Sequence, residues 1–124
     1  MKIKESAENY LEAILMIKNK KGYARSIDVA NHLNFSKPSV SVAMKSFREE
    51  GYITVDNDGN LDLTEKGQKI AAKMYERHET IAKTLMLLGV SEETAYEDSC
   101  KVEHDISDET FTCLKGYLKK KNLI

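Results

Sequence analysis

Residues 26–63 constrain the fold of this chain more than any other stretch. A short amphipathic segment begins near Ser26 and predicts one helix. The segment is interrupted before Ser36, which is a good N-cap for a second helix because Pro38 then lies in the first turn, where a missing N–H costs nothing. The second helix is expected to run from about residue 37 to residue 50 and to end at Gly51. The pattern predicts two helices joined by a tight turn.

A two-stranded hairpin is predicted directly after these helices. Residues 52–55 favour a β-strand, residues 56–60 form an Asp- and Asn-rich turn that contains a glycine, and residues 61–63 alternate between apolar and polar. The order helix, turn, helix and hairpin is that of a winged helix-turn-helix. We therefore expect residues 1–63 to form a winged helix-turn-helix DNA-binding domain, with the hairpin as its wing.

The second helix presents a slim, polar and basic outer face, with no acidic residue before Glu49. Hydroxyl and ammonium groups suit phosphates and base edges, and an exposed valine suits a thymine methyl group. The simpler alternative is a solvated helix face, but the adjoining turn and hairpin favour a role in DNA reading. The candidate DNA contacts are Ser36, Lys37, Pro38, Ser39, Ser41, Val42 and Lys45, together with Arg25 just before the first helix.

The overall charge does not by itself indicate nucleic-acid binding. The 124 residues carry a formal net charge of −1, whereas a dedicated binder is often strongly basic. The wing is acidic at Asp56 and Asp58, so its tip is not expected to grip phosphates directly. A winged helix that binds protein rather than DNA remains open as an alternative on this ground.

The rest of the chain predicts a mainly α fold, with a helical metal-binding and dimerisation domain over residues 64–124. Helices are expected from Ser6 to Gly22, from Thr64 to about Leu88, from Ser91 to about Ile106 and from Ser107 to the basic tail. No apolar run approaches the length of a membrane span, and the N-terminus lacks a signal-peptide core, so we expect a cytoplasmic protein with no membrane partner. The residues expected to face inward include Ile27, Ala30 and Leu33, then Val40, Ala43, Met44 and Phe47, then Leu88, and then Phe111, Cys113 or Leu114, and Tyr117 or Leu118.

Cys100, Glu103 and His104 follow one another at i, i+3 and i+4, which places three different donors on one helix face. Mixed sulfur, oxygen and nitrogen donors suit first-row divalent ions better than Mg²⁺ or Ca²⁺. The alternative is a buried cysteine beside two surface residues. An enzyme is not favoured, because HETIA is not an H-E-x-x-H motif and neither a phosphate loop nor a nucleophile elbow is present.

These motifs resemble the diphtheria toxin repressor and manganese transport regulator family of metal-dependent repressors. The resemblance spans nearly the whole chain and rests on GYAR, SKPSVS, LDLTEKG, ERHE, LLGV and, above all, CKVEHDIS. It implies a short-form repressor without an SH3-like domain that binds double-stranded operator DNA as a homodimer. The ligands it implies for the regulatory metal are Asn9, Glu12, His78, Cys100, Glu103 and His104.

Departures from the family pattern bear on the choice of metal. The iron-responsive branch has a methionine at the position of Asn9 and the manganese-responsive branch an aspartate, whereas Cys100 is like the iron branch. The resemblance therefore implies Mn(II) or Fe(II), with Co(II), Ni(II) or Zn(II) able to bind in vitro. Ala82 and Tyr96 replace ligands of the iron branch's ancillary site, which is not carried over. A winged-helix regulator without metal control remains the alternative function.

Overall fold

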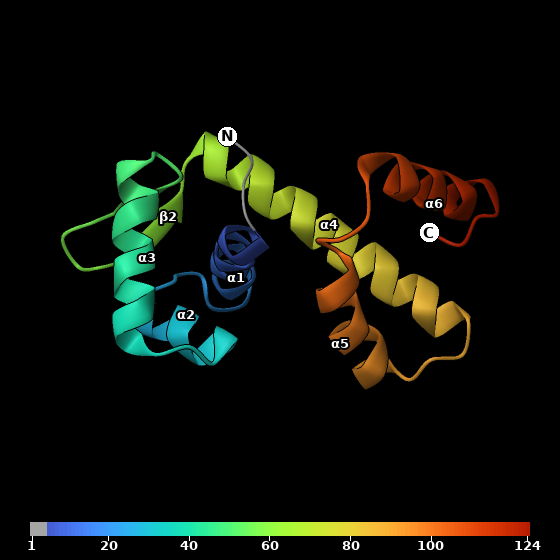
Figure 1. Ribbon diagram of the computed structural model, residues 1–124, viewed down its shortest axis with the longest axis horizontal. Coiled ribbons are helices and arrows are strands. Elements are labelled where there is room, and N and C mark those ends of the chain that lie inside the picture. The colour runs from blue at the N-terminus through green and yellow to red at the C-terminus, as the bar shows by residue number, and fades with distance from the viewer. Residues whose placement is uncertain (1–4) are drawn as a thin grey trace. The chain divides into compact units, whose positions relative to one another are not determined.

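The computed structural model describes residues 5–124, which form helices and a small two-stranded sheet (Figure 1). The chain divides into two compact units, Met1–Tyr75 and Glu76–Ile124. The elements are α1 (Glu5–Lys21), α2 (Ser26–Leu33), α3 (Lys37–Glu49), β1 (Ile53–Val55), β2 (Leu61–Leu63), α4 (Glu65–Leu87), α5 (Glu92–Val102) and α6 (Asp108–Lys120).

The first unit is built around an apolar core to which α1, α2, α3 and both strands contribute. Tyr10 and Phe47 pack edge to face with ring centroids 5.6 Å apart, and Phe47 and Tyr52 do so at 6.4 Å. Aromatic pairs in this geometry add to the stabilisation that burial alone provides. The fully buried aliphatic members of this core include Leu11, Ile14, Val29, Val40 and Ile53.

The turn between α2 and α3 forms as the sequence predicts. Ser36 caps α3 by accepting a hydrogen bond from the backbone N–H of Ser39, and Pro38 lies in the first turn of the helix. Asn34 closes α2 in the left-handed region, with φ of 58°, which asparagine tolerates better than most residues. Local capping therefore sets where each of the two helices begins and ends.

The wing pairs β1 with β2 in an antiparallel register, with Ile53 opposite Leu63 and Val55 opposite Leu61. Its turn is organised by Asp56, whose carboxylate accepts hydrogen bonds from the backbone N–H groups of Asp58 and Asn60. The first unit thus has the helix, turn, helix and wing order of a winged helix-turn-helix.

The start of α4 is closely packed on the beginning of the wing. Thr64 donates its hydroxyl hydrogen to the carbonyl of Gly51 at 2.6 Å and accepts from the N–H of Gly67. A Cβ at Gly67 would lie 2.1 Å from the carbonyl oxygen of Tyr52, so a larger residue does not fit there without a backbone shift. Thr64 is the N-cap that the sequence predicts.

The second unit consists of the later part of α4 with α5 and α6. Ser91 and Ser107 cap α5 and α6 by accepting from the N–H groups of Thr94 and Thr110, as predicted. Ala95, Phe111 and Leu118 are buried. None of the helices over residues 5–124 is both long and apolar enough to cross a membrane.

Four sequence predictions about helix limits and faces are wrong. Ser6 lies inside α1 rather than at its N-cap, and α5 ends at Val102 rather than near Ile106. In α2, Val29 is buried and Ile27 is 39% exposed, because an eight-residue helix with apolar residues on several sides takes its inner face from its tertiary contacts. Leu88 is 77% exposed rather than facing inward. Of the alternatives predicted for α6, Leu118 is buried and Leu114 partly buried, whereas Tyr117 and Cys113 are exposed.

Candidate functional site

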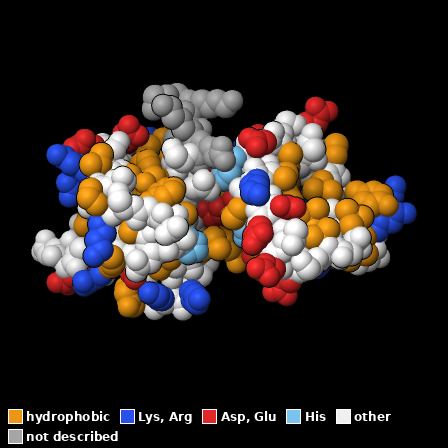
Figure 2. Space-filling model, turned by 60° about the horizontal axis from the view of Figure 1, so that its bottom comes forward, with side chains coloured by type: hydrophobic (Ala, Val, Ile, Leu, Met, Phe, Trp, Pro, Cys, Tyr) orange, Lys and Arg blue, Asp and Glu red, His pale blue; other side chains and the backbone are white. Residues whose placement is uncertain are grey.

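The exposed face of α3 carries every candidate DNA contact that the sequence predicts for that helix. Val42 is 71% exposed, which is unusual for a branched apolar side chain. Val40, two residues earlier on the same helix, is fully buried. The polar members surround it on the same outer surface, and Figure 2 shows Lys and Arg side chains gathered at the surface of the first unit. The exposed candidates are Ser36, Lys37, Pro38, Ser39, Ser41, Val42 and Lys45.

Arg25 is held at the base of the wing. Its backbone forms a β-bridge with Asn60, and its Nε donates to Asn60 Oδ1 at 3.3 Å. Its backbone N–H donates to Asp28 Oδ2 at 3.0 Å. The guanidinium is exposed, so the wing fixes the stem of an arginine that remains accessible to a phosphate.

Asp56, one of the two acidic residues of the wing, has a structural role in the turn. Hydrogen bonds from Asn60 and Asp58 hold the pKa of the Asp56 carboxyl below its usual value. Asp56 therefore closes the turn as a charged carboxylate and is not a free acidic group at the tip. Asn60 joins this turn to Arg25, a role that the sequence analysis did not identify.

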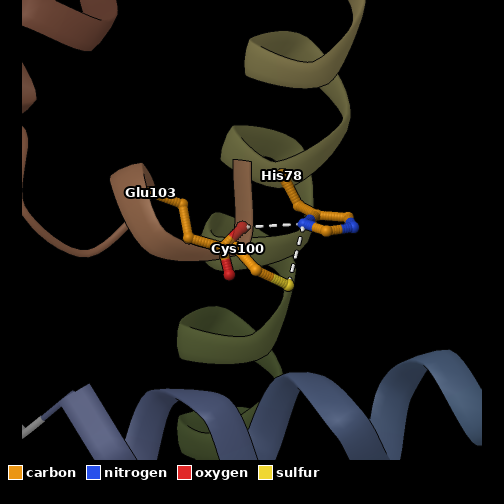
Figure 3. Close-up of side chains that lie close together, drawn as sticks. All are labelled: His78, Cys100 and Glu103. Atoms are coloured by element: carbon orange, nitrogen blue, oxygen red, sulfur yellow. Dashed lines mark hydrogen bonds and ion pairs between the residues drawn. The ribbon is translucent and has the colours of Figure 1, made fainter. Parts of the chain in front are cut away.

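In the second unit, His78 of α4 meets Cys100 of α5 and Glu103, the C-cap of α5 (Figure 3). His78 Nδ1 lies 3.0 Å from Glu103 Oε2 and 3.9 Å from Cys100 Sγ. One nitrogen, one sulfur and one carboxylate oxygen of these residues all lie within 4.8 Å of one another. His104 is adjacent, with its Nε2 3.2 Å from the second oxygen of Glu103.

These separations are close to those between two ligands of a single first-row metal ion. Nitrogen and oxygen ligands lie about 2.0–2.2 Å from such an ion and thiolate sulfur about 2.3 Å, so two ligands of one tetrahedral ion are about 3.3–3.6 Å apart. The observed pairs at 3.0 and 3.9 Å lie on either side of that range. The donor set of thiolate, imidazole and carboxylate is also one that transition metals prefer over Mg²⁺ or Ca²⁺.

The three donors differ in their exposure and charge. Glu103 is completely buried and His78 is 5% exposed, whereas Cys100 is exposed. Hydrogen bonds to Cys100 and Glu103 outweigh burial and raise the pKa of His78 to about 10. Without metal, the imidazole therefore holds a proton that compensates the buried carboxylate, and a metal ion bound at Nδ1 has to displace that proton.

Contacts from α5 hold α4 in place at His78. Ser99, which is fully buried, donates its hydroxyl hydrogen to the carbonyl of His78 at 2.6 Å. The ring of Tyr96 lies 5.3 Å from the His78 ring, and its hydroxyl donates to Glu79 at 2.9 Å. Tyr96 thus packs beside the ring of His78 and joins α5 to α4 through Glu79.

Arg77 fixes the turn that follows α5. Its Nη1 donates to the carbonyls of Glu103 and Ile106 at 3.0 and 2.7 Å, and its Nη2 pairs with Asp108. Its guanidinium also lies over the ring of Phe111. The sequence analysis did not identify Arg77 or Ser99, although Arg77 directly precedes His78 in the ERHE motif.

The two remaining ligand candidates, Asn9 and Glu12, belong to the first unit. They share one face of α1 at i and i+3. Glu12 is 4% exposed, which is unusual for a carboxylate, and Asn9 is partly buried. In the second unit the structure brings together His78, Cys100 and Glu103, and it places His104 against the other carboxylate oxygen of Glu103.

A winged helix-turn-helix with an exposed basic helix, followed by a helical unit with a transition-metal donor cluster, defines a class of metal-responsive DNA-binding regulators. Residues 2–61 match the family model described as iron dependent repressor, N-terminal DNA binding domain. Residues 64–122 match the model described as iron dependent repressor, metal binding and dimerisation domain. The chain therefore belongs to the iron dependent repressor family of metal-dependent transcriptional repressors.

Curated relatives agree with this assignment. The chain is 37% identical over 102 residues to the HTH-type transcriptional regulator MntR of Geobacillus kaustophilus, a match that covers 82% of this chain and 72% of the relative. It is 36% identical over 118 residues to an HTH-type transcriptional regulator of Methanocaldococcus jannaschii, and this match covers 94% of each protein.

Solved structures show the same fold. The metal-dependent transcriptional regulator MtsR superposes with a TM-score of 0.82 at 27% identity, over 91% of this chain and 53% of that one. The IdeR of T. acidophilum superposes with a TM-score of 0.80 at 23% identity, over 98% of this chain and 55% of that one. This chain spans about half the length of each of these two structures.

Proposed function

We propose that this chain represses transcription by binding operator DNA as a homodimer when Mn(II) or Fe(II) occupies the cluster around His78. The observation that carries the proposal is the convergence of His78 Nδ1, Cys100 Sγ and a Glu103 oxygen within 4.8 Å. The family models for DNA binding and for metal binding with dimerisation support it. The chain is proposed to act in the cytoplasm, without catalytic activity.

The proposed ligands are His78, Cys100, Glu103 and His104, completed by Glu12 and Asn9 of α1. The bound ion would supply positive charge that replaces the proton on His78 and neutralises the buried Glu103 carboxylate. Cys100 and His78 keep Co(II), Ni(II) and Zn(II) possible in vitro, because imidazole and thiolate accept all of these ions.

On the DNA side, α3 would enter the major groove and Arg25 would contact the backbone. Lys37 and Lys45 provide charge for phosphates, and Val42 provides an apolar surface for a thymine methyl group. Pro38 and the three serines at 36, 39 and 41 make the start of the helix narrow enough to approach base edges. The exposure of all these side chains supports this assignment.

Exposed apolar side chains on the second unit support a homodimer. Leu88 is 77% exposed and Tyr117 is 58% exposed, and Figure 2 shows hydrophobic side chains gathered on the surface of this unit. Such patches on a small chain are typical of protein interfaces. A two-fold dimer would present two copies of α3 to successive major-groove half-sites.

Metal control would operate as a linkage between two binding events. Metal strengthens DNA binding only if the ion binds more tightly to the DNA-binding state of the protein than to its other states. DNA must then strengthen metal binding by the same factor. Ligands drawn from both α1 and the second unit would provide that difference in affinity, because α1 belongs to the DNA-binding unit.

The test begins by selecting duplexes from a random library with Mn(II)-loaded protein under anaerobic conditions. Affinity for the selected duplex is then measured by fluorescence anisotropy with Mn(II), with Fe(II) and with chelator. We expect metal to tighten binding by at least tenfold and the double variant Cys100→Ala, His104→Ala to abolish the difference. Equal affinity with metal and chelator would contradict the proposal and favour a winged-helix regulator without metal control.

A further inference from the structure

We infer that Arg77 is a positioning residue for the metal site: its guanidinium holds the backbone turn at 103–106 so that the Glu103 carboxylate faces His78. This inference rests on the proposed metal site and adds a residue that binds no metal itself. It follows from three structural observations on the second unit, which concern the end of α5, the contacts of Arg77 and the place of Arg77 in the sequence.

The first observation is that α5 ends immediately before the ligands. Its last residue is Val102, and Glu103 and His104 lie in the turn that follows. The last carbonyls of a helix have no partner within the helix and need one from elsewhere. The Glu103 N–H still donates to the carbonyl of Ser99, whereas its own carbonyl lies beyond the end of the helical ladder.

The second observation is that Arg77 supplies the missing partner. One nitrogen, Nη1, donates to the carbonyls of Glu103 and of Ile106, which are the two ends of the turn. The other terminal nitrogen pairs with Asp108, in the first turn of α6. The Arg77 side chain is only 4% exposed and its contact with the Glu103 carbonyl is buried, whereas its partner Asp108 is exposed.

The third observation is that Arg77 precedes His78 on the same turn of α4. The ligand His78 and the residue that holds the turn are thus fixed to one rigid stretch of helix. A displacement of the turn would change the 3.0 Å separation between His78 Nδ1 and Glu103 Oε2. Cys100 lies within α5, where Ser99 joins α5 to the carbonyl of His78, and it does not depend on this contact.

The test compares Arg77→Gln with wild type by Co(II) titration of the full-length protein under anaerobic conditions. We expect Co(II) affinity to fall 10–100-fold, as is usual when a residue that orients a ligand is removed. The thiolate-to-Co(II) charge-transfer band should persist because Cys100 stays in place. The ligand-field bands should change because the Glu103 carboxylate is displaced.

A matched control removes an ion pair made by Glu76, the residue before Arg77 on α4. Lys115→Gln removes the ion pair of Lys115 with Glu76, which joins α6 to α4 at 3.1 Å without touching the turn. This variant should keep wild-type affinity and spectrum. If it lowers affinity as much as Arg77→Gln does, general loosening of the helices accounts for the effect and the inference is overturned.

Arg77→Lys is the second variant, used in case Arg77→Gln does not fold. Lysine keeps the charge beside Asp108 but lacks the planar fork of arginine, so affinity should still fall at least fivefold. A folded variant of either kind with wild-type affinity and unchanged ligand-field bands overturns the inference. Absence of the charge-transfer band from wild type would instead contradict the proposed metal site itself.

Discussion

His78 Nδ1 lies 3.0 Å from Glu103 Oε2, and both side chains are almost completely buried. This pair joins α4 to the end of α5 and also lies at the centre of the proposed metal site. It therefore has one role in the metal-free fold and another in metal binding, and the two roles can be measured separately.

We expect His78→Ala to destabilise the metal-free protein by about 2 kcal/mol, because the buried Glu103 loses a charged hydrogen-bond partner. Urea denaturation in the presence of chelator measures this effect. Lys83→Ala, at an exposed position of the same helix, is the control and should change stability little. An unchanged unfolding midpoint for His78→Ala would show that the pair does not stabilise the metal-free fold.

The raised pKa of His78, about 10, predicts how metal affinity depends on pH. Metal binding at Nδ1 releases the proton, so affinity should rise with pH, with His78 alone contributing up to about tenfold per pH unit below its pKa. Mn(II) titrations between about pH 6.5 and about pH 8.5 test this, since the lower limit is the unperturbed pKa of histidine. Affinity that is independent of pH would contradict the displacement of a proton from His78.

The same pKa predicts the opposite trend for the stability of the metal-free protein. The pKa of His78 in the folded state is above its unfolded value of about 6.5, so protonation favours folding. This contribution is fully present below about pH 6.5 and is lost as pH rises towards 10. Denaturation with chelator across this range, compared between wild type and His78→Ala, isolates the part due to His78.

Lys37→Ala and Lys45→Ala should weaken DNA binding at all sequences to a similar extent. If each lysine contacts one phosphate, each variant lowers the slope of log affinity against log salt by about 0.9. Lys69→Ala removes a lysine from the exposed face of α4 and is the control of equal charge change. The prediction fails if all three variants have the same salt dependence.

Gly67→Ala should destabilise the winged unit by about 2–3 kcal/mol. The added Cβ would overlap the carbonyl oxygen of Tyr52, and backbone atoms on both sides would have to move. Gly116→Ala is the matched control, because nothing lies within 4 Å of its Cβ and α6 should gain about 0.5–1 kcal/mol. Thermal denaturation of the two variants should therefore shift in opposite directions.

Asn9→Asp tests the proposed contribution of α1 to the metal site. Replacing a neutral amide oxygen with a carboxylate adds ligand charge, which should tighten Mn(II) binding by on the order of tenfold. Asn31→Asp adds the same charge at an exposed position of α2 and should leave Mn(II) affinity unchanged. Equal affinities for both variants would exclude Asn9 from the ligand set.

The DNA-binding helix could be predicted from sequence because its determinants are local. Ser36 and Pro38 define the start of α3, and the spacing of Val40, Met44 and Phe47 defines its inner face. The inner face of α2 could not be predicted, since Ile27 and Val29 compete for it and contacts with the rest of the unit decide between them. Short helices carry too few positions to settle their own orientation.

The metal cluster was predictable only in part, for a similar reason. Cys100 and Glu103 are three residues apart, whereas His78 joined them only through the family resemblance. Arg77 and Ser99 were not predicted because both donate to backbone carbonyls that are distant in the sequence. Arg77 donates to the carbonyls of Glu103 and Ile106, and Ser99 donates to the carbonyl of His78. Sequence patterns record side chains, and they do not show which backbone carbonyl a distant side chain will reach.

Cys100 is exposed, whereas the neighbouring proposed ligands His78 and Glu103 are buried. An arriving ion would reach the exposed Cys100 sulfur before the buried Glu103 carboxylate. The same exposure leaves the Cys100 sulfur accessible to alkylating reagents. A bound ion would lower the nucleophilicity of the Cys100 thiolate, so the rate of Cys100 alkylation would report how often the ion leaves.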